Sequence, residues 1–127
     1  MSKPVANHPP LPRSFEEFWP WYMAAHQDAR CRAVHYVGSI GGLVALGAFL
    51  ATGQWWLIPA GIVFGYACAW SGHFVFERNR PATFVKPWWS FMGDWRMFWM
   101  WITGRERQAV ALGADLPDIS ETIRAAR

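Results

Sequence analysis

The sequence predicts an all-α membrane protein: a two-span transmembrane helical hairpin with amphipathic, aromatic-rich interfacial helices on either side. The chain has 127 residues, of which 53% are hydrophobic and 10 are tryptophan, which is unusually apolar for a soluble domain. No Asp, Glu, Lys or Arg occurs between Ala33 and Phe76. We therefore expect one membrane-embedded helical domain over residues 14–105, between a flexible proline-rich arm at 1–13 and a polar C-terminal tail at 106–127.

The charge-free stretch is too long for one membrane crossing. As a continuous helix it would extend roughly 66 Å, whereas a hydrocarbon core is about 30 Å thick. Residues 52–54 are its only cluster of polar and flexible residues, so they predict a turn between spans at about 34–51 and 55–76. A buried soluble hairpin is the alternative, but 127 residues leave too little chain to cover two such helices.

Basic residues predict the orientation of the hairpin. Arg30 and Arg32 precede the first span, Arg78, Arg80 and Lys86 follow the second, and the connecting turn is uncharged. Both termini of this integral membrane protein are therefore expected in the cytoplasm, with no signal peptide in front of the first span. The net charge of +3 suits contact with membrane lipids, and no nucleic-acid partner is expected because no nucleic-acid motif occurs.

Two aromatic regions flank the hairpin. Ser14 with Glu17 predicts a capping box at the start of a helix, which Pro20 should kink or restart. The stretch over residues 87–105 is apolar, yet it is short for a span and carries Asp94 and Arg96 at its middle. It is expected to lie in the membrane surface or to fold under the hairpin.

Two histidines are expected at the same depth. His35 lies 17 residues before Thr52, and His73 lies 18 residues after Trp55, so the two helices should bring both imidazoles to one leaflet. Ionisable residues inside a membrane are costly and usually functional. The alternative is that each imidazole bonds a backbone carbonyl or a lipid phosphate.

A third histidine joins them only if the chain turns. His26 precedes His35 by nine residues, and an unbroken helix would rotate by about 900° over that length, which places them on opposite faces. Gln27 and Asp28 offer a turn, with Asp28 as the N-cap of the following helix. We expect His26 to face the same site through that turn.

Glu77 adds a carboxylate, because residues four apart share a helix face and it lies four residues after His73. Three imidazoles and a carboxylate can bind a divalent metal, and this donor set suits non-haem iron or zinc. Glu77 could instead orient a ligating histidine or pair with an arginine, and the spacing leaves this open.

Three segments carry a family resemblance: "HQDARCRAVHYVG", "GHFVFERNRPATF" and "GDWRMFWMW". Over about residues 15–105 the chain resembles the iron-dependent 2-hydroxy fatty acid dioxygenases of fatty acid α-oxidation and their short bacterial relatives. The resemblance implies an Fe(II) enzyme that uses O2 to cleave a 2-hydroxy fatty acid to CO2 and the acid one carbon shorter. It implies His26, His35 and His73 as metal ligands and the bacterial inner membrane as the location. The characterised enzymes have more transmembrane helices than this chain.

The chemistry of this reaction suggests roles for residues near the histidines. Glu77 and Arg80 are the expected catalytic residues. Arg32, Arg78 and Asn79 are the expected substrate-binding residues. Any of the three arginines could steer the carboxylate of the fatty acyl substrate, and the sequence leaves the choice open.

Two other function classes remain open at this point. A bis-histidine haem protein would use His35 and His73 as axial ligands and would show a strong Soret band. A non-catalytic membrane lipid-binding module would need no metal, and its activity would survive alanine at either histidine. One hairpin is small for an enclosed site, so a homodimer is also considered.

Overall fold

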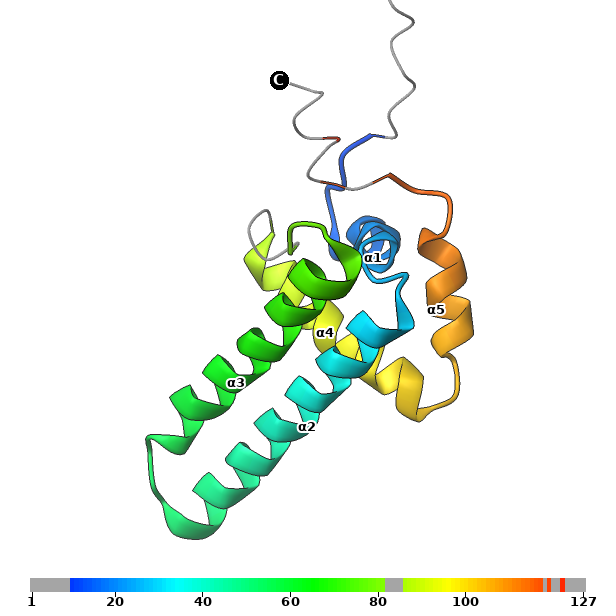
Figure 1. Cartoon of the computed structure of the whole chain (residues 1–127). Coiled ribbons are helices and arrows are strands. Elements are labelled where there is room, and N and C mark those ends of the chain that lie inside the picture. The colour runs from blue at the N-terminus through cyan, green and yellow to red at the C-terminus, as the bar shows by residue number, and fades with distance from the viewer. Residues whose placement is uncertain (1–9, 82–85, 118, 120–121, 123–127) are drawn as a thin grey trace, which may run out of the picture.

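Two long antiparallel helices project from a cluster of shorter ones (Figure 1). The computed structural model describes residues 10–81, 86–117, 119 and 122, and these contain helices and no β-strand. The all-α class is therefore confirmed. The elements are α1 (Phe15–Ala24), α2 (Ala29–Thr52), α3 (Leu57–Gly72), the π-helical turn η1 (His73–Glu77), α4 (Pro87–Ile102) and α5 (Glu106–Gly113).

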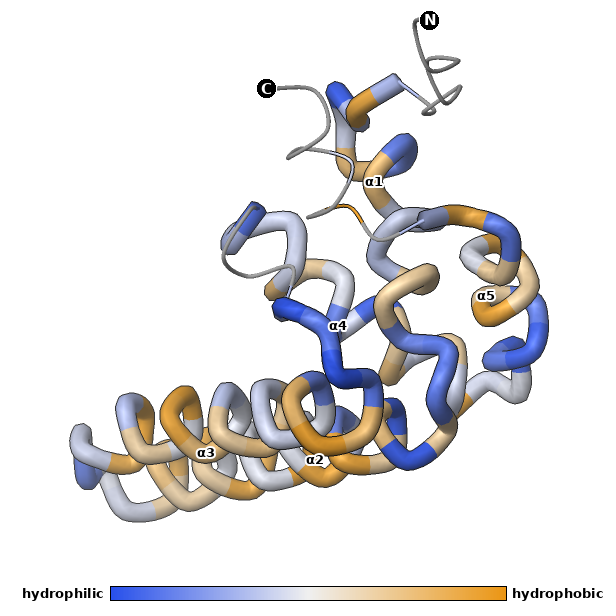
Figure 2. Tube along the Cα trace, turned by 45° about the horizontal axis from the view of Figure 1, so that its top comes forward, coloured by the Kyte–Doolittle hydropathy of each residue, from blue (hydrophilic) through white to orange (hydrophobic). Residues whose placement is uncertain are grey.

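The two long helices begin and end at local signals in the sequence. The Asp28 side chain accepts a hydrogen bond from the Arg30 N–H and caps α2. Gly53 ends α2 with a φ of 70°, a left-handed conformation that glycine adopts without strain. α2 and the continuous stretch of α3 and η1 are both long and apolar enough to cross a membrane. Figure 2 shows hydrophilic residues gathered at the base of this pair, beside α4.

Small residues allow α2 and α3 to pack closely. A Cβ atom added to Gly38 would lie 3.1 Å from both Cys68 Cβ and the Gly65 carbonyl oxygen. One added to Gly61 would lie 2.8 Å from Ala45 Cβ. Glycine at these positions lets the two backbones approach, as small residues do between membrane helices.

An aromatic core forms where α1 meets α4 and α5. Its buried members include Phe18, Trp19, Trp21, Tyr22, Met23, Met97 and Phe98. The expectation of α1 as an interfacial helix therefore needs correction, because its aromatic residues are buried against protein. α4 keeps apolar residues on its surface, with Trp88 and Trp99 more than half exposed.

α1 continues through Pro20 as one helix, so the helix does not restart there. The carbonyl that proline leaves without an intrahelical partner is that of Glu16, in the exposed first turn, where water can satisfy it. The Ser14 side chain accepts a hydrogen bond from the Glu17 N–H as predicted. The Glu17 carboxylate accepts from the Arg13 N–H at 2.7 Å.

The first part of the predicted C-terminal tail is folded. α5 lies along α1, with Ala109 fully buried between them. A Cβ atom added to Gly113 would lie 2.3 Å from the Ala24 nitrogen, so the helices touch through backbone. Ile119 is also buried in this core. Polar composition did not reveal this packing because α5 presents few apolar side chains to the core, among them Ala109 and Val110.

Candidate metal centre

Three elements bring His26, His35 and His73 together. His26 follows α1 directly, His35 lies in the second turn of α2, and His73 opens η1. All three side chains are buried, and their ligand atoms lie within 4.8 Å of one another. The chain turns between α1 and α2 as expected, which allows His26 to face His35. The three histidines thus form a group that can hold a metal ion.

The three imidazole rings stand edge to face around a common point. The ring centroids of His26 and His35 are 4.6 Å apart, those of His26 and His73 4.5 Å, and those of His35 and His73 5.0 Å. The interplanar angles are 81°, 79° and 90° in the same order. Each ring therefore meets the other two nearly at right angles, and no two are stacked.

Backbone carbonyls determine the tautomers of two histidines. His26 Nδ1 lies 2.6 Å from the Tyr22 carbonyl oxygen, and His35 Nδ1 lies 2.8 Å from that of Cys31. A carbonyl only accepts, so each Nδ1 carries the hydrogen and each Nε2 carries a lone pair. A histidine that binds a metal through one ring nitrogen typically donates a hydrogen bond from the other ring nitrogen to a protein oxygen.

The two Nε2 atoms fit a shared cation. His26 Nε2 and His35 Nε2 are 3.1 Å apart, and in these tautomers neither has a hydrogen to donate to the other. Two lone pairs at this distance repel unless a positive charge lies between them. Nitrogens bound to one ion at about 2.1 Å can be at most about 4.2 Å apart, so the spacing suits a shared metal.

Asn79 orients the third histidine. His73 Nδ1 lies 2.8 Å from Asn79 Oδ1, while Asn79 Nδ2 donates to the Ala25 carbonyl at 3.2 Å. The second bond identifies Oδ1 as the atom that faces His73, so His73 also carries its hydrogen on Nδ1. The wide turn of η1 and the left-handed Arg78, with a φ of 54°, return the chain so that Asn79 lies beside His73.

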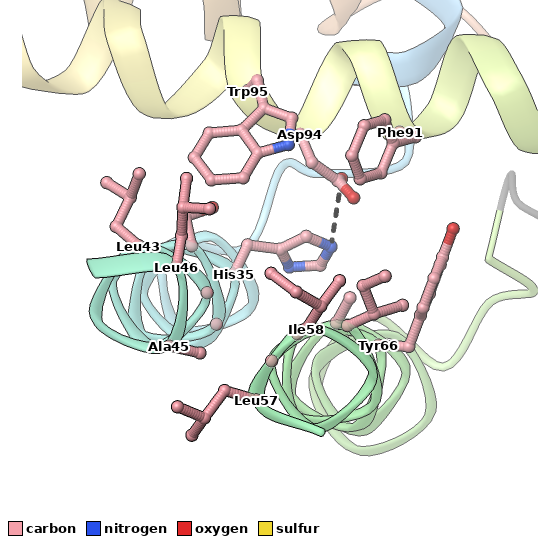
Figure 3. A pocket seen from close by; sticks show the side chains of 17 residues that line it. His35, Leu43, Ala45, Leu46, Leu57, Ile58, Tyr66, Phe91, Asp94 and Trp95 are labelled. Atoms are coloured by element: carbon pink, nitrogen blue, oxygen red, sulfur yellow. Dashed lines mark ion pairs between the residues drawn. The ribbon is translucent and has the colours of Figure 1, made fainter. Parts of the chain in front are cut away.

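Tyr22 and Asp94 form a polar pair beside the histidines. The Tyr22 ring stacks on His26 with centroids 4.0 Å apart, and its hydroxyl donates to Asp94 Oδ1. Asp94 Oδ1 in turn lies 4.0 Å from His35 Nε2, as the dashed line in Figure 3 marks. Asp94 was not among the predicted site residues. The signal for it in the sequence is a carboxylate in the middle of an apolar aromatic helix.

Burial shifts the ionisation of these groups. Desolvation, with smaller contributions from His35 and His73, holds the pKa of His26 well below its usual value, so the ring is neutral and able to bind a metal. Burial raises the pKa of Asp94 to about 7, opposed by the Tyr22 hydrogen bond. Burial and the charge of Asp94 raise the pKa of Tyr22, so its hydroxyl stays a donor.

Glu77 lies apart from the histidine group. Its Oε1 accepts a hydrogen bond from the Asp28 N–H at 2.5 Å, which joins η1 to the start of α2. Arg78 and Arg80 are exposed on the chain that follows. The structure therefore places the predicted catalytic Glu77 in a contact that holds the turn after His26, and the two arginines at the surface nearby.

Arg32 is buried and bonded to protein on several sides. Its Nη1 donates to the carbonyls of His26 at 2.8 Å and Gln27 at 2.7 Å, and its Nε donates to Glu106 at 2.5 Å. This predicted substrate-binding residue thus holds the backbone next to His26 and joins it to α5.

A cavity of about 190 Å³ adjoins the histidines between α2, α3 and α4. His35 and Asp94 form one polar end, as Figure 3 shows. Most of the remaining wall is apolar or glycine, with Leu43, Leu46 and Ile58 among its members.

Comparison with known protein families identifies a match that covers most of the chain. The family described as 2-hydroxy-palmitic acid dioxygenase Mpo1-like matches residues 12–106, a range that contains all three histidines. No curated protein and no solved structure matches the chain.

Proposed function

This chain belongs to the Mpo1-like family of 2-hydroxy-palmitic acid dioxygenases, and on that premise we propose that it cleaves 2-hydroxy fatty acids with O2. The products are CO2, water and the fatty acid one carbon shorter. This reaction balances with O2 as the only oxidant. The observation that carries the proposal is the buried group of His26, His35 and His73, whose Nδ1 atoms all face protein oxygens.

Fe(II) is the proposed metal, held by the Nε2 atoms of these three histidines. Bound iron would supply O2 activation and open positions for the oxygen atoms of the substrate. Zinc fits the donor set but has no redox chemistry, so it suits a dioxygenase poorly. Haem is poorly supported, because ring centroids 4.5 to 5.0 Å apart leave no gap for a porphyrin between two histidines.

The surrounding residues orient the ligands and exclude water. Asn79 and the carbonyls of Tyr22 and Cys31 hold each imidazole in the ligating tautomer. The exposed Arg78 and Arg80 are proposed to attract the substrate carboxylate at the rim. A catalytic role for Glu77 or Arg80 stays a prediction.

Membrane embedding completes the proposal. α2 and the stretch of α3 with η1 cross the bilayer, with both termini on the cytoplasmic side of a bacterial inner membrane. Support comes from their length and from exposed apolar residues along the pair, such as Val44, Leu50 and Val63. A fatty acyl substrate would then reach the enzyme from the lipid phase.

Metal analysis with a matched control tests this function. The protein is purified anaerobically in mild detergent, as wild type, His35→Ala and His73→Ala. The control is His8→Ala, at a histidine in the proline-rich arm over residues 1–13 that was not predicted to bind metal. We expect near-stoichiometric iron in the wild type and in His8→Ala, and loss of iron in the other two. Iron-loaded protein given 2-hydroxypalmitate and O2 should release the acid one carbon shorter, detected by mass spectrometry. Absence of iron after reconstitution, or of this product, would refute the proposal. Membrane binding that survives both substitutions would then favour the lipid-binding module.

A further inference from the structure

The cavity beside the metal centre continues away from it along one face of α2. His35, Ser39, Gly42 and Leu46 recur at helical spacing on its wall. From His35 to Leu46 the helix extends about 16 Å. His35 and Asp94 are the polar groups at the end next to the other two histidines, whereas Leu43 and Leu46 lie about two and three turns farther along α2. Figure 3 shows these side chains around the same space.

This arrangement matches a ligand with one polar end and one long apolar end. A polar head at His35 and Asp94 would be within reach of the metal, and an attached hydrocarbon chain would replace water along the apolar wall. The cavity is continuous with the metal centre because His35 belongs to both.

We propose that this cavity binds the acyl chain of the 2-hydroxy fatty acid, and that Gly42 determines how long a chain it accepts. The inference rests on the proposed function, because it takes the head group of the substrate to lie at the three histidines. Gly42 lies on α2 about 10 Å along the helix from His35.

Gly42 differs from the glycines that hold the two helices together. A Cβ atom added to Gly38 would lie 3.1 Å from Cys68 Cβ on α3, and one added to Gly61 would lie 2.8 Å from Ala45 Cβ on α2. One added to Gly42 meets nothing within 4 Å, although Gly42 lines the cavity. A side chain introduced at Gly42 therefore occupies open cavity space without displacing either helix. It should block the part of the cavity that lies beyond Gly42, away from the histidines.

Gly47 provides a matched control on the same helix. A Cβ atom added there also meets nothing within 4 Å, but Gly47 does not line the cavity. Leucine at either position gains the same helix propensity and the same apolar surface. Gly42→Leu and Gly47→Leu therefore differ mainly in whether the new side chain enters the cavity.

The test measures binding and turnover of saturated 2-hydroxy fatty acids of increasing chain length by iron-loaded wild type, Gly42→Leu and Gly47→Leu. Binding is measured without O2, turnover with it. We expect Gly42→Leu to lose about tenfold or more in affinity and kcat/KM for long chains, while short chains and iron content stay unchanged. Gly47→Leu should keep the chain-length profile of the wild type.

Three outcomes would overturn the inference. If Gly42→Leu turns over 2-hydroxy fatty acids with the chain-length profile of the wild type, the cavity does not bind the acyl chain, while the proposed function stands. An equal shift in Gly47→Leu assigns the effect to the helix and not to the cavity. Loss of co-purified phospholipid from Gly42→Leu, with 2-hydroxy acids unaffected, assigns the cavity to a bilayer lipid. A wild type that turns over no 2-hydroxy acid rejects the proposed function itself.

Discussion

The hydroxyl of Tyr22 donates a hydrogen bond to Asp94 Oδ1 while the ring of the same tyrosine stacks on His26. This contact joins α1 to α4 and keeps a carboxylate 4.0 Å from His35 Nε2. Because the Tyr22 side chain contacts both His26 and Asp94, a change in its position would move both groups. The pair is therefore a useful point at which to perturb the centre without touching its ligands.

Tyr22→Phe should destabilise the protein by about 1–3 kcal/mol, because the ring remains on His26 while Asp94 loses a hydrogen-bond donor in a buried place. Thermal unfolding in detergent measures the change. Tyr66→Phe is the control, since its hydroxyl makes no hydrogen bond to the other described residues. Equal effects of both substitutions would show that the Tyr22 bond contributes nothing specific.

Asp94→Asn should remove a pH dependence from the metal-free protein. Burial raises the pKa of Asp94 from 3.8 to about 7, so the folded state binds more protons than the unfolded state between these values. Stability of the wild type should therefore fall as pH rises from about 4 to about 7, and above that range the variant should be more stable by about 1–3 kcal/mol. Unfolding midpoints at pH 5 and pH 8 decide this, and parallel slopes for both proteins would contradict it.

Asn79→Ala should weaken iron binding by about 10–100-fold, because His73 loses the group that orients it. Asn79→Asp keeps the acceptor oxygen beside His73 Nδ1 and should retain most of the affinity. Iron titration under anaerobic conditions provides the readout, with the exposed Gln108→Ala as control. If iron affinity is unchanged and only KM for the fatty acid rises, Asn79 contacts substrate, which is the role predicted from the sequence.

Arg32→Met should cost about 3 kcal/mol or more, because it leaves buried carbonyls and Glu106 without their donor. Glu106→Gln keeps an acceptor for Arg32 Nε and should cost only about 1 kcal/mol. Unfolding free energies test both. A stable Arg32→Met protein with a large rise in KM would instead support the predicted substrate-binding role.

Glu77→Gln should lower stability by about 1 kcal/mol or less, since the amide oxygen can still accept from the Asp28 N–H. Glu77→Ala removes the acceptor and should cost about 1–3 kcal/mol. Comparison of kcat in the two variants separates the roles. Retained kcat in Glu77→Gln indicates a structural residue, and a large loss in this variant with intact iron indicates a catalytic one.

Several features were predictable because their signals are local. The absence of charge from Ala33 to Phe76 predicted two apolar helices, and the structure has helices of that length and composition there. Asp28 predicted a helix start, and Gly53 lies in the predicted turn. Helix periodicity placed His35 and His73 at one level, and a cap residue explained how His26 could join them.

Other features depended on contacts between segments far apart in the chain. Only the packing of α1 against α4 and α5 buries the aromatic face that was expected at an interface. Asn79 Nδ2 donates to the Ala25 carbonyl, and Glu77 accepts from the Asp28 N–H, so both residues contact segments far earlier in the chain. The Asp94 carboxylate reaches His35 from α4, 59 residues later in a chain of 127.

The sequence by itself therefore determined which elements form and which three histidines can meet, because helix length, capping and periodicity are properties of neighbouring residues. The tertiary structure decided which atoms face one another. The contact of Asp94 with His35 and the open space at Gly42 arise from packing between helices that are distant in sequence. Such packing depends on backbone geometry and on side-chain shape across several elements, and no local pattern encodes it.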